Sequence, residues 1–258
     1  MTAETQTSSG GTSTTGVAPL LEARGISKHF GAVVALSDVN FHVNAGEVVG
    51  LIGDNGAGKS TFIKTLSGTY KPDEGQIFVN GEPVEFSGPR DAQEAGIETV
   101  YQDLALFDEL SIAANIFAGR EKVSVGGLLK DKEMRDFTKD LIARLGVDLP
   151  SSKTVVRNLS GGQRQAVALA RAVGFGTRIA FFDEPTSALS KAASEHVLGV
   201  ISDLRKQNLG CIFIGHNLEH VMEVCDRIVV LRQGSIAGEV QKADFSVIGL
   251  VSLMVGGK

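Results

Sequence analysis

A glycine-rich loop between an apolar strand and a helix restricts the possible folds of this chain more than any other feature. Residues 53–60 read GDNGAGKS and match the pattern GxxxxGK[ST], with an apolar run before them and a helical segment at 61–66 after them. In such a loop, glycines let backbone N–H groups surround phosphates, and the N-terminus of the next helix adds a positive dipole end. The lysine can reach the β- and γ-phosphates, and the last hydroxyl can coordinate Mg²⁺. The pattern predicts a nucleotide site formed by Gly53, Asp54, Asn55, Gly56, Ala57, Gly58, Lys59, Ser60 and Thr61.

Three further apolar runs indicate which kind of sheet this loop belongs to. Residues 179–182, 211–214 and 228–231 are almost continuously hydrophobic, and helical segments such as Ser194–Lys206 separate them. Strands with this composition are buried on both faces, as in a parallel sheet covered by helices. The chain is therefore expected to adopt an α/β fold.

Two regions interrupt the α/β pattern. Between Leu20 and Phe86 the sequence predicts short strands, with Asn80-Gly81 as the turn of a hairpin. From about residue 103 to residue 156 the pattern instead predicts a mostly helical lobe inserted into the core. Its hydrophobic residues at helical spacing are Met134, Phe137, Leu141, Ile142 and Leu145.

The two ends of the chain differ in character. Residues 1–18 contain mostly Thr, Ser and Gly, so they are expected to form a disordered tail. The apolar stretch Val247–Val255 is expected to be a terminal helix packed on the core.

Composition excludes several classes of protein. The 258 residues carry 25 Lys and Arg against 30 Asp and Glu, and the net charge of −5 argues against broad binding of nucleic acid. Cys211 and Cys225 cannot form a disulfide framework and lack metal-ligand spacing, which indicates a reducing compartment. No apolar run approaches 18 residues and the start lacks the apolar core of a secretory signal, so we expect a cytoplasmic protein without membrane-spanning helices.

An acidic pair, Asp183-Glu184, ends the apolar run at 179–182. In proteins with this phosphate loop, a carboxylate at the end of a neighbouring strand holds Mg²⁺, and Asp183 fits that place. Glu184 could face the water that attacks the γ-phosphate. The spacing alone leaves open which of the two acids is the base.

The segment Leu159–Gln163 reads LSGGQ, about 20 residues before the acidic pair. This is the signature of the ATP-binding-cassette (ABC) ATPases. The order of motifs also resembles that family: the phosphate loop, Gln102 after a strand, LSGGQ, the acidic pair, and His216 after a strand. The resemblance covers residues from about 20 to 240.

The resemblance implies an α/β fold with a P-loop (RecA-like) ABC ATPase core, an antiparallel β subdomain and an inserted helical subdomain. These parts occupy residues 19–258, with the helical subdomain at about 103–165.

The roles of the family's residues transfer to matching positions. Phe30 matches the aromatic residue that stacks on adenine, with a core phenylalanine as the alternative. Gln102 matches the glutamine that approaches Mg²⁺ and the attacking water, and His216 matches the histidine that contacts the γ-phosphate. The signature residues, which would contact ATP held by a second copy, are Ser160, Gly161, Gly162 and Gln163.

This division of the site implies a dimer. In the family, two ATP molecules are sandwiched head to tail between two ATPase subunits, and hydrolysis opens the pair. With one phosphate loop and one signature, this chain is expected to pair with a copy or a homologue. The loop at Ser187–Ser190 reads SALS where the family usually has SALD, a departure that bears on coupling between the two sites.

Family members drive transport, DNA repair or translation. The lobe is too short for the coiled coil of the repair proteins, and translation members usually carry two cassettes in one chain. The resemblance therefore implies the ATPase subunit of an importer, a translocase at the cytoplasmic face of the inner (plasma) membrane. Its partners would be a separate integral-membrane permease and, indirectly, a solute-binding protein, without nucleic acid.

The segments Val100–Leu106, Gly119–Glu121 and Gly215–Leu218 further resemble ATPases that import ribose, xylose or fructose. Import of branched-chain amino acids or another small solute is the alternative.

Overall fold

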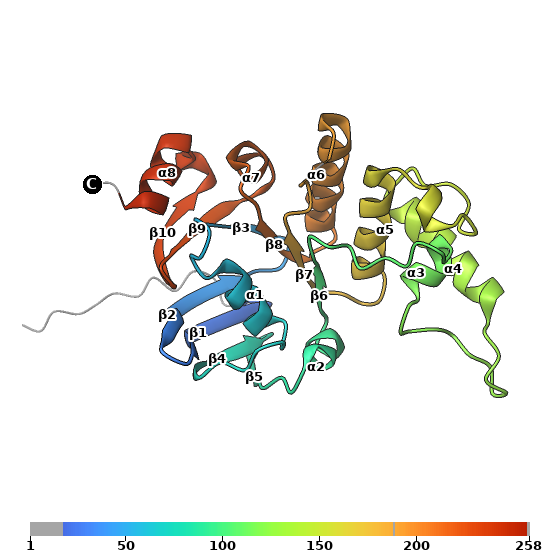
Figure 1. Cartoon of the computed structure of the whole chain (residues 1–258), viewed down its shortest axis with the longest axis horizontal. Coiled ribbons are helices and arrows are strands. Elements are labelled where there is room, and N and C mark those ends of the chain that lie inside the picture. Colours follow the sequence, from blue (N-terminus) through green and yellow to red (C-terminus); the bar gives the residue numbers. More distant parts are fainter. Residues whose placement is uncertain (1–17, 188, 257–258) are drawn as a thin grey trace, which may run out of the picture.

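Two β-sheets organise the computed structural model of the chain, which describes residues 18–187 and 189–256 (Figure 1). The strands are β1 (Leu21–Phe30), β2 (Val33–Val43), β3 (Val48–Ile52), β4 (Glu74–Val79), β5 (Glu82–Val84), β6 (Ile97–Val100), β7 (Ile179–Asp183), β8 (Gly210–Ile214), β9 (Arg227–Arg232) and β10 (Ser235–Gln241). One sheet has the order β10-β9-β3-β8-β7-β6 and is parallel except for β10 at its edge. The other sheet is antiparallel, with the order β2-β1-β4-β5. The expected mixture of a parallel core sheet and an antiparallel subdomain is confirmed.

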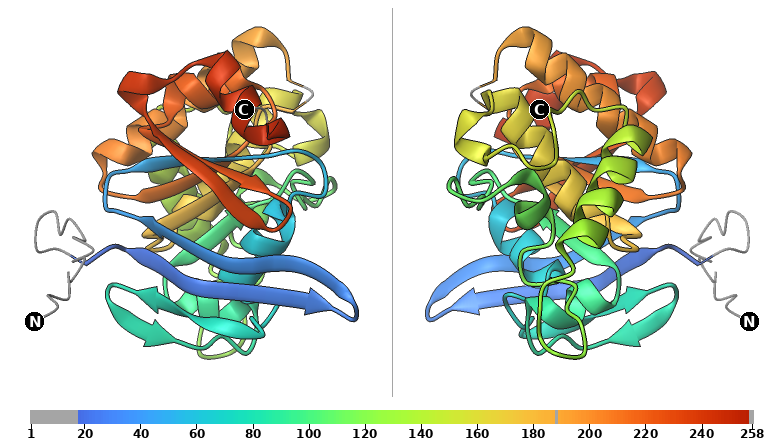
Figure 2. Two further views of the ribbon diagram at one scale, coloured as in Figure 1. Left: turned by 90° about the vertical axis from the view of Figure 1, so that its left-hand side faces the viewer. Right: turned by 90° about the vertical axis from the view of Figure 1, so that its right-hand side faces the viewer.

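Helices cover both faces of the parallel sheet. They are α1 (Lys59–Leu66), α2 (Pro89–Glu94), α3 (Ile112–Ile116), α4 (Asp131–Arg144), α5 (Gly161–Val173), α6 (Lys191–Lys206), α7 (Leu218–Val224) and α8 (Val247–Val255), with 3-10 turns at Val156–Asn158 and Lys242–Asp244. In Figures 1 and 2, α5 to α8 lie on one face of this sheet, while α1 and the antiparallel sheet lie on the other.

Each face of the parallel sheet has its own hydrophobic core. Successive side chains of a strand point to opposite faces, so Phe181 of β7 packs in the core under α1 and Phe182 packs in the core under the other helices. Cys211 and Ile212 of β8 divide in the same way. This two-sided burial is why the three apolar runs show no alternation in the sequence.

The helical lobe is built from α3, α4 and the first part of α5 (Figure 1, right). Three aromatic rings hold it together: Phe117 meets Phe137 and Phe175 edge-on at centroid distances of 5.2 and 5.1 Å, and Phe137 stacks on Phe175 at 5.4 Å. Of the apolar residues expected to face the core of the lobe, Met134, Leu141 and Leu145 are buried, and Phe137 and Ile142 pack partly buried against them.

Capping residues explain where the sequence-based helix boundaries were wrong. Helix α5 begins at Gly161, inside the signature, because Ser160 and Gln163 form a reciprocal capping box. Helix α6 begins at Lys191 rather than Ser194, because the Ser190 hydroxyl accepts a hydrogen bond from the amide of Ala193 at 3.4 Å. Strands β1 and β2 have 10 and 11 residues and are longer than expected, whereas the hairpin at Asn80-Gly81 is confirmed.

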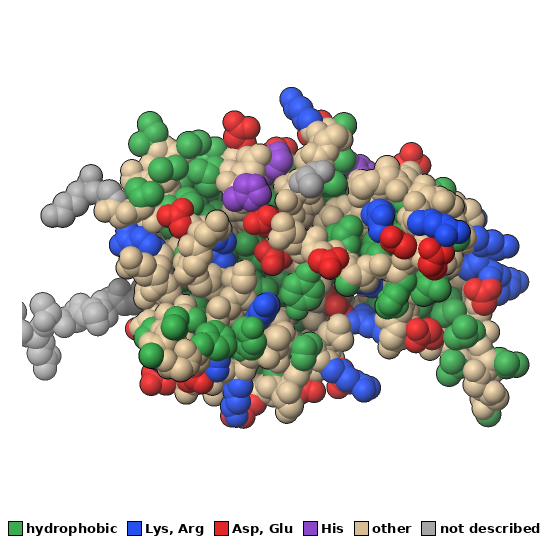
Figure 3. Space-filling view, viewed as in Figure 1, with side chains coloured by type: hydrophobic (Ala, Val, Ile, Leu, Met, Phe, Trp, Pro, Cys, Tyr) green, Lys and Arg blue, Asp and Glu red, His purple; other side chains and the backbone are tan. Residues whose placement is uncertain are grey.

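The expected terminal helix is present as α8, which packs against β9 and β10. Only Leu250 is fully buried, while Ile248 is 80% exposed, and hydrophobic side chains gather over this helix in Figure 3. Across the described residues no helix combines the length and hydropathy needed to span a bilayer. The tail expected at 1–18 lies outside these residues except for Ala18.

Candidate nucleotide-binding and hydrolysis site

The phosphate loop connects the end of β3 to the start of α1, at the carboxyl edge of the parallel sheet. Two of its glycines are required by space as well as by conformation. Gly53 has φ 154°, and a Cβ there would lie 2.2 Å from the carbonyl oxygen of Leu231. Gly58 has φ 107°, and a Cβ there would lie 2.8 Å from the carbonyl oxygen of Ala35. The backbone can therefore bend tightly around an anion at the N-terminus of α1.

Lys59 lies in the mouth of this loop. Its ammonium group donates to the carbonyl oxygens of Gly53 at 2.6 Å and Asp54 at 3.1 Å. Burial lowers its pKa, and the nearby carboxylates of Glu184 and Asp183 act in the opposite direction. A partly desolvated cation held by two carbonyls can exchange these contacts for phosphate oxygens.

An open cavity of about 310 Å³ brings the loop together with residues far away in the sequence. Residues 55–61 line it, together with Gln102 from the segment after β6 and with Asp183 and Glu184 from the end of β7. Gly53 and Asp54 do not line the cavity, but their carbonyls accept the hydrogen bonds of Lys59. One cation, two carboxylates, the amides of Asn55 and Gln102 and the hydroxyls of Ser60 and Thr61 therefore belong to residues that line the cavity.

The two carboxylates at the end of β7 have different environments. Burial raises the pKa of Asp183, the adjacent charge of Glu184 raises it further, and Lys59 and Lys64 oppose this shift. Glu184 has φ 51°, a strained value for a residue with a side chain, and its amide donates to the carbonyl of Ile214 at 2.9 Å. This conformation turns the chain sharply after Asp183.

His216 lies beside Glu184 with its Nδ1 atom 3.4 Å from the Glu184 Oε2 atom. Its side chain is 72% exposed, whereas that of Glu184 is 27% exposed. His216 and Glu184 border a smaller cavity of about 100 Å³, which opens next to the larger one because both share Glu184. The imidazole can therefore donate a hydrogen bond to Glu184 or to an anion in front of it.

Sequence reasoning missed a second contact between the same two segments. Thr186 Oγ1 and His220 Nδ1 are 3.0 Å apart, so the turn after Glu184 is hydrogen-bonded to helix α7, which follows His216. Asn217 caps α7 through hydrogen bonds from the amides of Glu219 and His220. The one available signal was a second histidine four residues after His216; His216 precedes α7 and His220 lies in the first turn of that helix.

The signature residues lie elsewhere on the same chain. None of the residues from Ser160 to Gln163 lines the cavity around Lys59. Ser160 and Gly161 are exposed at the N-terminus of α5, where the free amides of a helix attract anions. The structure thus separates the two halves of the predicted site within one chain.

Phe30 is not a core residue, so that alternative is wrong. It is 44% exposed at the end of β1 and meets Tyr70 edge-on at a centroid distance of 5.3 Å. Phe30 does not line the cavity, although Val33 and Val34 of the next strand do.

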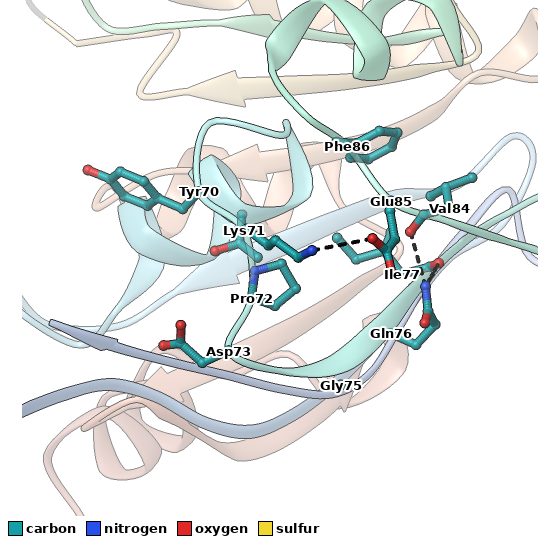
Figure 4. A pocket seen from close by; sticks show the side chains of 11 residues that line it. Tyr70, Lys71, Pro72, Asp73, Gly75, Gln76, Ile77, Val84, Glu85 and Phe86 are labelled. Carbon is teal, nitrogen blue, oxygen red and sulfur yellow. Dashed lines mark hydrogen bonds and ion pairs between the residues drawn. The ribbon is translucent and has the colours of Figure 1, made fainter.

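Tyr70 borders a separate cavity of about 170 Å³ between the end of α1 and β4–β5 (Figure 4). Polar side chains at that cavity are already paired. The Lys71 ammonium lies 3.3 Å from the Glu85 carboxylate, and the Gln76 side chain donates to the carbonyl of Val84 at 3.0 Å.

A profile of the ABC transporter family matches residues 36–187. The xylose/arabinose import ATP-binding protein XylG of Sulfolobus acidocaldarius is 47% identical over 235 residues, which span 91% of this chain and 93% of that protein. The fructose import ATP-binding protein FrcA of Rhizobium meliloti is 43% identical over 93% of this chain and 95% of its own length. The ribose import ATP-binding protein RbsA 2 of Streptomyces avermitilis is also 43% identical, but the match spans 48% of that longer protein.

Solved structures share the fold at lower identity. A nucleotide-free ATP-binding cassette from an ABC transporter superimposes with a TM-score of 0.81 at 24% identity, over 92% of this chain and 98% of that one. A dimeric bacterial ABC transporter cassette gives a TM-score of 0.73 at 22% identity, over 87% of this chain and all of that one. From the family match and the similarity over nearly the whole length, the chain belongs to the ABC transporter family, as one of its ATP-binding subunits.

Proposed function

We propose that this chain is the ATP-hydrolysing subunit of an importer that takes up a monosaccharide through a separate permease. The observation that carries the chemistry is the cavity in which Gln102, Asp183 and Glu184 face the phosphate loop. The sugar assignment is supported by the 43–47% identity to proteins named for import of xylose, arabinose and fructose, over more than 90% of this chain.

In the proposed reaction, a water molecule attacks the γ-phosphorus of ATP in line with the bond to the leaving ADP. Glu184 orients this water and accepts its proton as the new P–O bond forms and the bond to ADP breaks. Lys59 and the loop amides hold the β- and γ-phosphates, and His216 donates a hydrogen bond to the γ-phosphate. Phe30 at the end of β1 would stack on the adenine.

The residues around the cavity fit a bound Mg²⁺. Ser60, Gln102 and Asp183 offer a hydroxyl, an amide carbonyl and a carboxylate, and Mg²⁺ prefers oxygen ligands of these kinds together with substrate phosphates. The raised pKa of Asp183 also indicates a carboxylate whose charge is poorly compensated by its surroundings. When bound, Mg²⁺ would neutralise charge on the β- and γ-phosphates.

The exposed N-terminus of α5 supports a head-to-tail dimer. Because Ser160, Gly161, Gly162 and Gln163 lie away from the cavity of their own chain, they would complete the site of a second copy. Free helix amides and the positive end of the dipole suit the γ-phosphate there. Two ATP molecules would then be enclosed between two subunits.

The transport role places the dimer at the cytoplasmic face of the inner membrane, as a peripheral subunit. The permease and a solute-binding protein would select the sugar, because the ATPase subunit does not contact it. The −5 net charge remains unfavourable for a nucleic-acid partner.

Copurification tests this proposal. The chain is tagged in its own cells, membranes are solubilised in mild detergent, and copurifying proteins are identified by mass spectrometry, with an untagged strain as control. A multi-span permease is the expected partner, and the permease complex with its binding protein should hydrolyse ATP faster with one sugar of a panel. Recovery of ribosomes, nucleic acid or soluble proteins only would contradict the importer assignment.

A further inference from the structure

The segment that follows Gln102, residues 103–109, is held by helix α5. The Arg171 guanidinium donates from Nη1 to the carbonyl of Ala105 at 2.8 Å and from Nη2 to the carbonyl of Leu104 at 2.7 Å. Arg164 pairs with the carboxylate of Asp108 a few residues further on. Both arginines project from one face of α5, because residues seven apart in a helix lie on the same side.

The turn held by Arg171 is an unusual one. Ala105 has φ 47°, a strained value for a residue with a side chain that persists only where neighbouring groups enforce it. The Ala105 amide has only a weak bond to the Asp103 carboxylate at 3.3 Å. The two bonds from Arg171 are therefore the main hydrogen bonds to the backbone of Leu104 and Ala105, while Asn115 of α3 holds the amide and the carbonyl of Phe107 at 2.7 and 3.0 Å.

Arg171 itself is in an unfavourable environment. Burial lowers its pKa, and the positive charge of Arg120 lowers it further. Across the described residues, no carboxylate lies within 4.0 Å of the Arg171 guanidinium, although Arg120 has Glu98 as its partner. A partly buried charge without a counter-ion is costly, so the two carbonyl bonds must compensate for it.

Helix α5 links this contact to the signature residues. Ser160 caps the N-terminus of α5, and Arg171 lies 11 residues later, about 16 Å along the axis at 1.5 Å per residue. The helix also packs against α3 of the lobe and against α6 and β6. A displacement of the signature end would therefore be transmitted through a rigid element to the backbone beside Gln102.

We propose that Arg171 is a positioning residue for Gln102: by holding the carbonyls of Leu104 and Ala105, it makes the place of Gln102 in the cavity depend on the position of α5. In this way the occupancy of the signature by a second subunit's nucleotide is coupled to the chain's own hydrolysis site. This inference rests on the proposed ATPase function.

A double-mutant cycle on the full chain tests it, with Arg171→Lys, Gln102→Ala and the double variant. Lysine keeps the charge but cannot bond two adjacent carbonyls with a fork, so Arg171→Lys should lower kcat by about 10-fold to 100-fold, as expected for misplacement of a group near the reacting atoms. The Kd for ATP of the isolated chain should stay within about 2-fold of the wild type, because the contacts of the phosphate loop are unchanged. In the Gln102→Ala background, Arg171→Lys should have little further effect, since the two residues act as one unit.

Arg205→Lys is the matched control. Arg205 lies on α6 and pairs with Asp226 at 2.6 Å, away from residues 103–109, so its replacement should leave kcat unchanged. Hydrogen exchange provides a readout independent of activity: amides of residues 103–109 should exchange faster in Arg171→Lys and in the uncharged Arg171→Gln, but not in Arg205→Lys.

The inference fails if Arg171→Lys leaves kcat unchanged, or if it lowers kcat by the same factor in the Gln102→Ala background as in the wild type. It also fails if hydrogen exchange at residues 103–109 does not change. Failure of the transport role is distinguishable, because it appears as the absence of a permease in copurification while the cycle is measured on ATP hydrolysis alone. If the wild-type chain does not hydrolyse ATP, the proposed function fails and hydrogen exchange still decides whether Arg171 holds the segment.

Discussion

At the scale of single residues, Glu184 is placed by its backbone more than by its side-chain contacts. Its φ of 51° and the bond from its amide to Ile214 turn the chain so that Asp183 and Glu184 both line the cavity. The His216 Nδ1 atom, 3.4 Å from its carboxylate, is its one close side-chain contact with a titratable group among the described residues. A replacement that keeps the size of this side chain should therefore keep the geometry and remove the proton acceptor.

Glu184→Gln should bind ATP normally but hydrolyse it about 100-fold to 10,000-fold more slowly, which is the usual contribution of a general base. The variant should also accumulate as a dimer with Mg²⁺ and ATP, because the step that opens the dimer is blocked. Phosphate release and light scattering measure the two effects. Turnover at the wild-type rate would remove Glu184 from the proposed mechanism.

The two buried thiols give a prediction independent of catalysis. Burial raises the pKa of Cys211 to about 12 and that of Cys225 in the same direction. Iodoacetamide at pH 8 should therefore label neither thiol in the folded chain and both in denaturant. Stoichiometric labelling of the native chain would contradict this burial.

The same shift gives a pH dependence of stability. Since the folded pKa of Cys211 lies above the unfolded value of 9.0, its contribution is intact below pH 9 and is lost as the pH rises towards 12. Urea unfolding at pH 8 and at pH 10 measures this effect. Between these two pH values, the free energy of unfolding should fall more in the wild type than in a Cys211→Ala variant.

At the scale of elements, helix N-caps define the loops of the site. Ser160 ends the signature loop by capping α5, Ser190 ends the SALS loop by capping α6, and Asn217 ends the loop of His216 by capping α7. Serine and aspartate are both good N-cap residues, which explains how Ser190 can stand where the family usually has an acid. Serine at position 190 therefore keeps the role of N-cap of α6 that an aspartate could also fill.

Ser190→Ala should therefore destabilise the chain by about 1 kcal/mol, the typical cost of losing an N-cap, whereas Ser190→Asp should be close to neutral. Urea unfolding of the wild type and both variants measures this difference. Equal stability of the alanine and aspartate variants would show that the cap does not hold α6.

At the scale of the whole molecule, the cavity around Lys59 and the exposed start of α5 are separate surfaces of one chain. The lobe that carries the signature is inserted between β6 and β7. Two segments of the chain therefore connect it to the parallel sheet: the segment after Gln102, which follows β6, and α5, which leads to β7. In the proposed head-to-tail dimer, each site would therefore be completed only by the second subunit.

Ser160→Arg should consequently leave ATP binding by the monomer unchanged and block ATP-dependent dimerisation, because a bulky cation would fill the position of a partner's phosphate. Ser160→Ala is the control, since it also removes the cap of α5 but adds no bulk. Light scattering of both variants, each made with Glu184→Gln to slow hydrolysis, distinguishes the effect of the added bulk from that of the lost cap. A normal dimer with Ser160→Arg would reject the role of the signature in a second subunit's site.

The sequence by itself determined the family, the α/β class and the phosphate loop. These features depend on residues adjacent in the chain: glycines that permit a tight turn, apolar runs that require burial on both faces, and motifs such as LSGGQ. The order of Gln102, the acidic pair and His216 was likewise readable, because each follows an apolar strand.

Only the tertiary structure decided how these residues are supported. The bonds of His220 to Thr186 and of Arg171 to Leu104 join residues 34 and 67 positions apart, and no local pattern specifies such pairs. The true starts of α5 and α6 also depended on whether a serine side chain reached the backbone. Periodicity records which residues are buried, whereas the geometry of a site depends on contacts that form only when distant segments pack together.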